Sequence, residues 1–162
     1  MEPDLLCCGK ALGGGLPIAA VLGGSELLAT WDPGAGGEAL HTATFLAHPL
    51  ACAAARATLE VIEDEGLVDR AAALGARLGP LLSSWPGRLP GVTAARGRGL
   101  LWGIELAAPA RAATAAAAAR ARGLLLLAGG AVLELCPPLS ISEELLALGC
   151  DILSEALAAI DG

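Results

Sequence analysis

The chain has 162 residues, of which 55% are apolar, and ten basic against seventeen acidic side chains give it a net charge of -7. This length fits one domain, or one small domain with part of another, and the apolar content is ample for a core. An acidic chain without a basic cluster lacks the footprint that nucleic-acid phosphates require, so DNA and RNA are not expected as partners.

No segment predicts a membrane span. The longest charge-free stretch, residues 39–55, contains two histidines and a proline, whereas a span needs about 20 predominantly apolar residues. The first residues lack the positive flank and apolar core of a secretory signal, and five cysteines leave one over under full pairing. We therefore expect a cytoplasmic, reducing location, with all five cysteines as small core residues and no metal site.

Nine of the ten basic side chains are arginine, and the one lysine, Lys10, lies between an apolar run at residues 5–8 and the glycines at 13–15. Arginine stays protonated, whereas a desolvated lysine amine condenses with an aldehyde. The apolar run predicts a buried strand that ends just before Lys10. Lys10 is therefore a candidate for covalent chemistry, and the alternative is a lysine left on a loop by chance.

The next segments alternate strand and helix. Residues 18–22 predict a second buried strand, Ser25 is expected to cap a short helix that ends near Trp31, and residues 32–37 form a predicted loop. Proline is favoured at the first position of a helix because its missing N–H has no partner there. Pro49 therefore predicts the start of a long helix over residues 49–65.

Gly66 is expected to end that helix, and an amphipathic helix follows over residues 67–85. The remaining chain predicts a hairpin, two helices and two short strands. These are a hairpin at 92–106 with Gly97 and Gly99 at its turn, an alanine-rich helix at 111–122, strands at 124–127 and 132–135, and a last helix from Ser142 to about residue 160.

Five motifs occur in a fixed order along the chain. They are Lys10-Ala11-Leu12-Gly13-Gly14-Gly15-Leu16-Pro17, His41-Thr42-Ala43-Thr44-Phe45, Pro49-Leu50-Ala51-Cys52, Arg96-Gly97-Arg98-Gly99-Leu100 and Pro137-Pro138-Leu139. In this order the chain resembles the class III aminotransferases, which are pyridoxal-phosphate enzymes of fold type I. The resemblance covers essentially the whole chain and implies a mixed α/β and α+β fold.

The resemblance assigns Lys10 as the catalytic residue, which bonds to the aldehyde of pyridoxal 5'-phosphate and then moves a proton between substrate and cofactor. It assigns Thr44 to the cofactor phosphate of the neighbouring subunit, which implies a homodimer. The reaction it implies moves an amino group from an amino donor to a 2-oxo acid. A hydroxyl that merely caps a loop is the alternative for Thr44.

Two positions depart from the family pattern. Where the family usually reads Gly-Asn-Pro, this chain has Ala47-His48-Pro49, so the family pattern alone does not fix the backbone path near the phosphate. Where many relatives place an arginine that binds the substrate carboxylate, this chain has Glu134, which a carboxylate does not approach. Glu134 attracts an amine or cationic substrate, or it is a solvated strand position.

The family's cofactor-cradling loop, ring-stacking aromatic and ring-nitrogen aspartate precede the lysine, so the chain resembles a C-terminal portion. The expected organisation is the tail of the large cofactor domain at residues 1–47, a linking helix at 48–66 and a C-terminal small α+β domain at 67–162. The alternatives are a noncatalytic remnant or dimerisation module of that fold, and an aminomutase or racemase of the same family.

Overall fold

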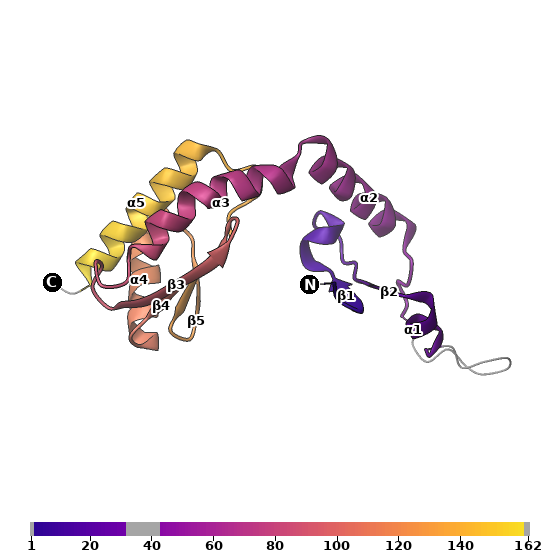
Figure 1. Ribbon diagram of the computed structural model, residues 1–162, viewed down its shortest axis with the longest axis horizontal. Helices are drawn as coiled ribbons and strands as arrows, with labels where there is room; N and C mark the ends of the chain where they lie inside the picture. The colour runs from indigo at the N-terminus through magenta and orange to yellow at the C-terminus, as the bar shows by residue number, and fades with distance from the viewer. Residues whose placement is uncertain (1, 32–42, 161–162) are drawn as a thin grey trace. The chain divides into compact units, whose positions relative to one another are not determined.

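The computed structural model describes residues 2–31 and 43–160, which fall into two units, Met1–Glu65 (unit 1) and Gly66–Gly162 (unit 2). Each unit combines helices with antiparallel strands (Figure 1). The mixture of secondary structure is the one that the sequence predicts. The loop expected at residues 32–37 lies outside the described residues.

In unit 1, strand β1 (Leu5–Cys8) pairs antiparallel with β2 (Ala20–Gly23). A 3-10 helix, η1 (Lys10–Gly13), follows β1 directly, and the long helix α2 (Pro49–Asp64) packs on it. The glycine run explains this close approach: a Cβ at Gly14 would lie 3.1 Å from the hydroxyl oxygen of Thr58 on α2, and Gly14 has a φ of +56°. Small residues therefore let η1 and α2 meet.

The prediction that the two strands of unit 1 are buried is wrong. The large apolar side chains Leu6 and Val21 are 53% and 55% exposed. Among the described residues β1 and β2 pair only with each other, so no further strand covers their outer edges. An apolar run reports a tendency to be buried, and burial itself depends on what packs against the strand.

Two details at the second strand also differ from expectation. The strand begins at Ala20, two residues later than predicted, and helix α1 spans Ser25–Ala29. The N-cap of α1 is Gly24, without a side-chain cap hydrogen bond, so Ser25 is the first helical residue and not the cap. The short helix therefore begins without side-chain capping.

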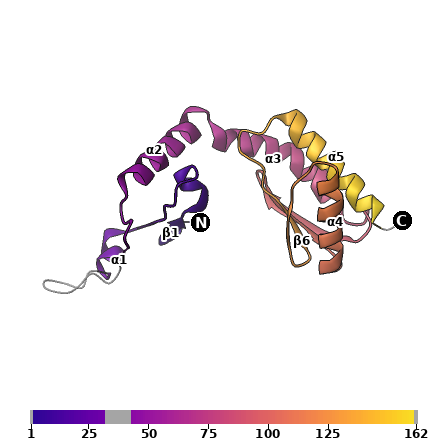
Figure 2. The ribbon, with the colours of Figure 1, turned by 180° about the vertical axis from the view of Figure 1, so that it is seen from behind.

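In unit 2, four antiparallel strands lie in the order β3 (Val92–Arg98), β4 (Leu101–Leu106), β6 (Val132–Leu135) and β5 (Leu127–Gly129). The helices are α3 (Leu67–Ser83), α4 (Pro109–Ala121) and α5 (Glu143–Ala159). Helix α4 packs against α5 and the strands, and α3 packs against β3 (Figure 2). All three helices contribute to one core.

That core follows from strict alternation along β4, where Trp102, Ile104 and Leu106 are buried. Alternate residues of a strand face the same side of a sheet, and the register places Trp102 opposite Leu135 and Ile104 opposite Leu133 of β6. The helices add buried leucines and alanines to the same cluster: Leu74, Leu78 and Leu82 from α3, Ala112, Ala115 and Ala116 from α4, and Leu153 and Leu157 from α5.

The hairpin turn differs from the prediction in one residue. Gly99, with a φ of +57°, lies in the turn as expected, whereas Gly97 lies inside β3 opposite Trp102. A Cβ at Gly97 would lie 2.3 Å from an indole carbon of Trp102. Gly97 is therefore required for the packing of an aromatic ring and not for a turn.

Strand and helix limits otherwise move by a few residues. The strand expected at 124–127 forms only at Leu127–Gly129, while α4 begins two residues early, at Pro109. The expectation that all cysteines are core residues is wrong: Cys150 is buried, but Cys7 and Cys136 are exposed. An apolar sequence around a cysteine therefore does not predict that the cysteine is buried.

Candidate functional site

A cavity of about 680 Å³ in unit 1 contains both residues that the sequence singles out. Lys10, the first residue of η1, and Thr44, in the turn before α2, both line it. The remaining lining residues come from the segment before β2 and from the start of α2; they are Pro17, Ile18, Ala19, Ala43, Phe45, Leu46, Ala47, His48 and Ala51. Residues distant in sequence therefore meet at one site.

The backbone at Lys10 is strained. Lys10 has a φ of +49°, a region that L-residues other than glycine rarely occupy. Ala47 has a φ of +50°, and these are the two non-glycine residues with positive φ in the part of the chain that the structure describes. Both line the same cavity. Strained backbone of this kind clusters at functional sites.

Ala47 resolves the first departure from the family pattern. The family usually has glycine here, and the left-handed φ of Ala47 is the conformation that favours glycine. The backbone therefore keeps the path that a glycine would follow, at the cost of local strain. The sequence alone does not reveal this, because the signal is the backbone angle of an ordinary alanine.

Consecutive turns hold the Thr44 segment. The amide of Leu46 donates to the carbonyl of Ala43 at 3.0 Å, and the amide of His48 donates to the carbonyl of Phe45 at 3.2 Å. The His48 ring meets the Phe45 ring edge-on at a centroid distance of 5.7 Å. His48 is the N-cap of α2 but makes no side-chain cap bond there. The preceding His41 and Thr42 lie outside the described residues.

The lining offers an amine, a hydroxyl and an imidazole on otherwise apolar walls. An amine condenses with a carbonyl group, and a hydroxyl donates a hydrogen bond to an anion such as phosphate. No carboxylate is among the lining residues that the structure describes. The donor set therefore fits an aldehyde that carries an anionic group, and it lacks an acidic partner for a ring nitrogen.

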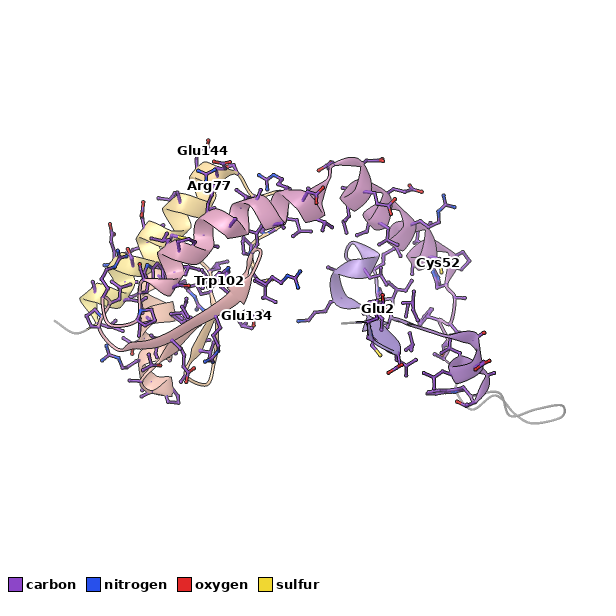
Figure 3. The ribbon with its side chains drawn as sticks, viewed as in Figure 1. Glu2, Cys52, Arg77, Trp102, Glu134 and Glu144 are labelled. Atoms are coloured by element: carbon purple, nitrogen blue, oxygen red, sulfur yellow. The ribbon has the colours of Figure 1, made fainter. Side chains whose placement is uncertain are left out.

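Glu134 is not among the residues that line this cavity. It lies on β6 in unit 2, opposite Gly103 of β4 and Leu127 of β5, and its side chain is exposed (Figure 3). It lines a separate cavity within unit 2.

Over the described ranges no helix is long and apolar enough to cross a membrane, and no group of three potential metal ligands occurs.

A sequence profile described as aminotransferase class III matches residues 1–157. The chain belongs to the class III aminotransferase family. It is 44% identical over 164 aligned positions to an acetylornithine aminotransferase of Gloeobacter violaceus, covering 100% of this chain and 38% of that protein. It is 40% identical to an ornithine aminotransferase of Bordetella pertussis, covering 98% of this chain and 37% of that protein.

A solved structure of the same family also superposes on this chain. The ornithine aminotransferase of Toxoplasma gondii, whose structure has pyridoxal phosphate at partial occupancy in its active site, superposes with a TM-score of 0.86 at 33% identity. The match covers 99% of this chain and 38% of that one. The family and fold class predicted from the ordered motifs are confirmed. The chain spans less than two fifths of the length of these relatives.

Proposed function

We propose that this chain supplies the lysine and phosphate-binding threonine of a pyridoxal-phosphate-dependent transaminase, which moves an amino group from an amino donor to a 2-oxo acid. One observation carries the proposal: in a member of the class III aminotransferase family, the single lysine and Thr44 line the same cavity. Their roles come from the motifs that contain them.

In this proposal Lys10 would hold pyridoxal phosphate by condensation of its Nζ with the aldehyde, which releases water. When bound, that cofactor supplies an electron sink for the bond broken at the substrate. With its amine free, Lys10 would take up a proton at Nζ from the substrate and return it. The Thr44 hydroxyl donates to the phosphate, and the backbone turns around it fix where that hydroxyl lies.

The chain offers an unusually clean test, because Lys10 is its one lysine and the N-terminus its one other aliphatic amine. We expect borohydride reduction with pyridoxal phosphate to leave a pyridoxyl adduct on Lys10, located by mass spectrometry. Lys10→Arg should lose that adduct and keep any N-terminal label. Thr44→Ala should weaken cofactor binding without removing the adduct. Labelling of the N-terminus alone would refute the proposal.

The resemblance implies a homodimer in which Thr44 serves the site of the neighbouring chain, and we propose this arrangement as the alternative to a site in which Lys10 and Thr44 of one chain act together. Mixed dimers of Lys10→Ala and Thr44→Ala chains test this. If the two residues act across an interface, one site of each mixed dimer keeps both groups, so the mixture binds cofactor better than either variant alone. No gain on mixing would place both residues in one chain's site.

A second candidate, a noncatalytic dimerisation module of the same fold, is favoured by Glu134 at the position where many relatives bind the substrate carboxylate. An absorbance scan with added pyridoxal phosphate separates the two. A shifted band that Lys10→Arg abolishes supports the enzyme, and an unchanged spectrum with a compact oligomer supports the module. A cytoplasmic location is proposed on the five cysteines, all of which are free.

A further inference from the structure

Among the described residues, His48 is the one polar side chain on the walls of the Lys10 cavity to which the proposed function gives no role. The other polar side chains on these walls are Lys10 and Thr44. In the proposed function Lys10 bonds to the aldehyde, and the Thr44 hydroxyl is a neutral donor. A phosphate monoester carries about -1.5 to -2 charges at neutral pH. A phosphate held by Thr44 alone would therefore have no cation beside it.

Thr44 and His48 lie four positions apart on one wall of this cavity. The segment that joins them is folded by two successive turns, which backbone hydrogen bonds of 3.0 and 3.2 Å close. Ala47, directly before His48, has the left-handed φ of +50°. One turn along α2 from His48, Ala51 is 5% exposed and lines the same cavity. The turns and the start of α2 therefore form one continuous wall, and this wall carries both hydrogen-bond donors.

The fold does not use the His48 imidazole for capping or for an ion pair. His48 is the N-cap of α2, a position where a side chain often accepts a hydrogen bond from the first turn, but its side chain makes no such bond. It belongs to no ion pair of the described residues. Its ring meets the Phe45 ring edge-on at 5.7 Å, a contact that orients the imidazole. The ring nitrogens therefore remain available to donate to a ligand.

The charges around His48 favour an anion. On the cavity walls that the structure describes, Lys10 of η1 is the other titratable side chain and no carboxylate occurs. On α2 itself, the thiol of Cys52 lies one turn beyond His48, and the first turn has no acidic residue. The positive end of the α2 dipole adds to the same preference. A histidine gains its positive charge between about pH 5 and 8, so a protonated His48 supplies the cation that the phosphate lacks.

We propose that His48 is a second phosphate-binding residue of this site, whose protonated imidazole donates from a ring nitrogen to a phosphate oxygen beside the Thr44 hydroxyl. The inference rests on the proposed function for the identity of that phosphate, which is the one of pyridoxal phosphate. It does not depend on which chain supplies Lys10, because Thr44 and His48 belong to one segment and serve the same phosphate. The family usually has asparagine here, a neutral donor, so the charge is a departure of this chain from the pattern.

The test compares pyridoxal 5'-phosphate with pyridoxal, which lacks the phosphate, in the complete chain. Equilibrium dialysis gives both dissociation constants, and their ratio measures the preference for the phosphate. We expect His48→Asn to lower this preference about tenfold, the factor for a hydrogen bond to a charged group. The loss should be larger at about pH 6 than at about pH 9, because the imidazole is charged at the lower pH. His48→Arg, which stays charged, should keep the preference at both. The titration of the phosphate itself is common to all variants and cancels in the comparison.

His48→Asn also separates phosphate binding from a structural role. Asparagine is among the preferred N-cap residues, so this variant should raise the urea midpoint of unfolding while it weakens the preference for the phosphate. A residue with a structural role alone would lower both together. Arg56→Gln is the control for charge, because it removes a cation from the same helix at a position that does not line the cavity. It should leave the preference unchanged.

An unchanged preference in His48→Asn at both pH values would overturn the inference, and a pyridoxyl adduct on Lys10 in the same chain would leave the proposed function standing. Inorganic phosphate gives a second readout, without the chemistry of Lys10. The chain has two histidines, so the NMR signal of His48 is the imidazole signal that His48→Asn removes. Phosphate should shift that signal in the unchanged chain and in Lys10→Arg. If no adduct forms on Lys10, a shift would reject the proposed function and keep His48 as an anion-binding residue, and no shift would overturn both.

Discussion

A close contact between helix α3 and a turn of unit 2 predicts that a normally favourable substitution is harmful at Gly75. This glycine lies within α3 and is buried, and a Cβ there would lie 2.4 Å from the Cα and 2.6 Å from the carbonyl oxygen of Gly99 in the β3–β4 turn. These are backbone atoms, so no side chain can move aside. Gly75→Ala therefore forces the helix and the turn apart.

The expected change in the free energy of unfolding is the difference between two effects. Alanine gains about 1 kcal/mol over glycine in a helix interior. Overpacking costs about 1–3 kcal/mol, and a clash with backbone belongs at the upper end of that range. We therefore expect Gly75→Ala to lower the free energy of unfolding by about 2 kcal/mol.

Gly149→Ala is the matched control, since it is the same substitution inside another helix of unit 2. A Cβ at Gly149 would lie 3.6 Å from a methyl carbon of Leu124, an ordinary van der Waals contact. It should therefore gain about 0.5–1 kcal/mol from helix propensity alone.

Urea unfolding followed by tryptophan fluorescence measures both variants, because Trp85 and Trp102 are buried in unit 2. A Trp31→Phe background removes the exposed tryptophan of unit 1. If Gly75→Ala stabilised the chain as much as Gly149→Ala, close helix-to-turn packing would not be what requires glycine at position 75.

Four further predictions concern unit 2. Trp85→Phe should cost less stability than Trp102→Phe in urea unfolding, because the Trp102 indole N–H donates to a carbonyl at 2.9 Å whereas that of Trp85 finds no acceptor among the described residues. Ser142→Ala should cost about 1 kcal/mol, because its hydroxyl accepts the amide hydrogen of the third helical residue of α5 at 3.2 Å. A backbone N–H and, to a smaller extent, that hydroxyl lower the pKa of Glu144, so the stability Glu144 adds is present above its unfolded pKa and lost as pH falls through the lower folded value. Burial, with a smaller contribution from the adjacent aspartate, raises the pKa of the Cys150 thiol, so it should be the slowest cysteine to alkylate at neutral pH and should accelerate as pH rises.

Each of these has a result that contradicts it. Equal losses for the two tryptophan variants would show that the indole hydrogen bond contributes nothing. Ser142→Asp keeps an acceptor and should retain most of the stability, so a loss as large as that of Ser142→Ala would reject capping. Glu144→Gln should differ from the unchanged chain at neutral pH and converge with it in acid. Rapid alkylation of Cys150 would mean that the α5 core opens readily.

Signals that act within a few residues predicted the fold well. Pro49 begins a helix, Gly66 at a φ of +58° separates two helices, and Ser142 caps α5, because each of these depends on local backbone geometry. The alternation along β4 predicted a buried face, since one side of that sheet packs against helices.

Properties that depend on distant neighbours were not predictable. The exposure of β1 and β2 follows from what packs against them, and Gly97 is needed because of the ring of Trp102 on the next strand. At the candidate site, the motifs identified Lys10 and Thr44, but their meeting in one cavity is set by the path of the whole of unit 1. Nothing in the identity of Ala47 indicates its left-handed backbone.

The strain at Lys10 gives a last prediction, because the conformational preference of the backbone at this position can be measured separately from the role of the side chain. A left-handed φ costs an L-residue about 1–2 kcal/mol, and glycine avoids this cost but loses about 0.5–1 kcal/mol to its freedom when unfolded. Lys10→Gly should therefore stabilise η1 by about 0.5–1 kcal/mol relative to Lys10→Ala. Native-state hydrogen exchange reads this at the amide of Leu12, which donates to the carbonyl of Gly9 at 3.1 Å.

The neighbouring Ala11 provides the control, because its φ is not positive and Ala11→Gly should speed the same exchange. Opposite effects of glycine at two adjacent positions would show that the backbone at position 10 favours glycine, although the chain places its one lysine there. The lysine side chain would then be kept, at a position where the backbone favours glycine, because its amine has a chemical role. If Lys10→Gly and Lys10→Ala exchanged alike, the backbone would be unstrained, and only the shared cavity with Thr44 would support a chemical role for Lys10.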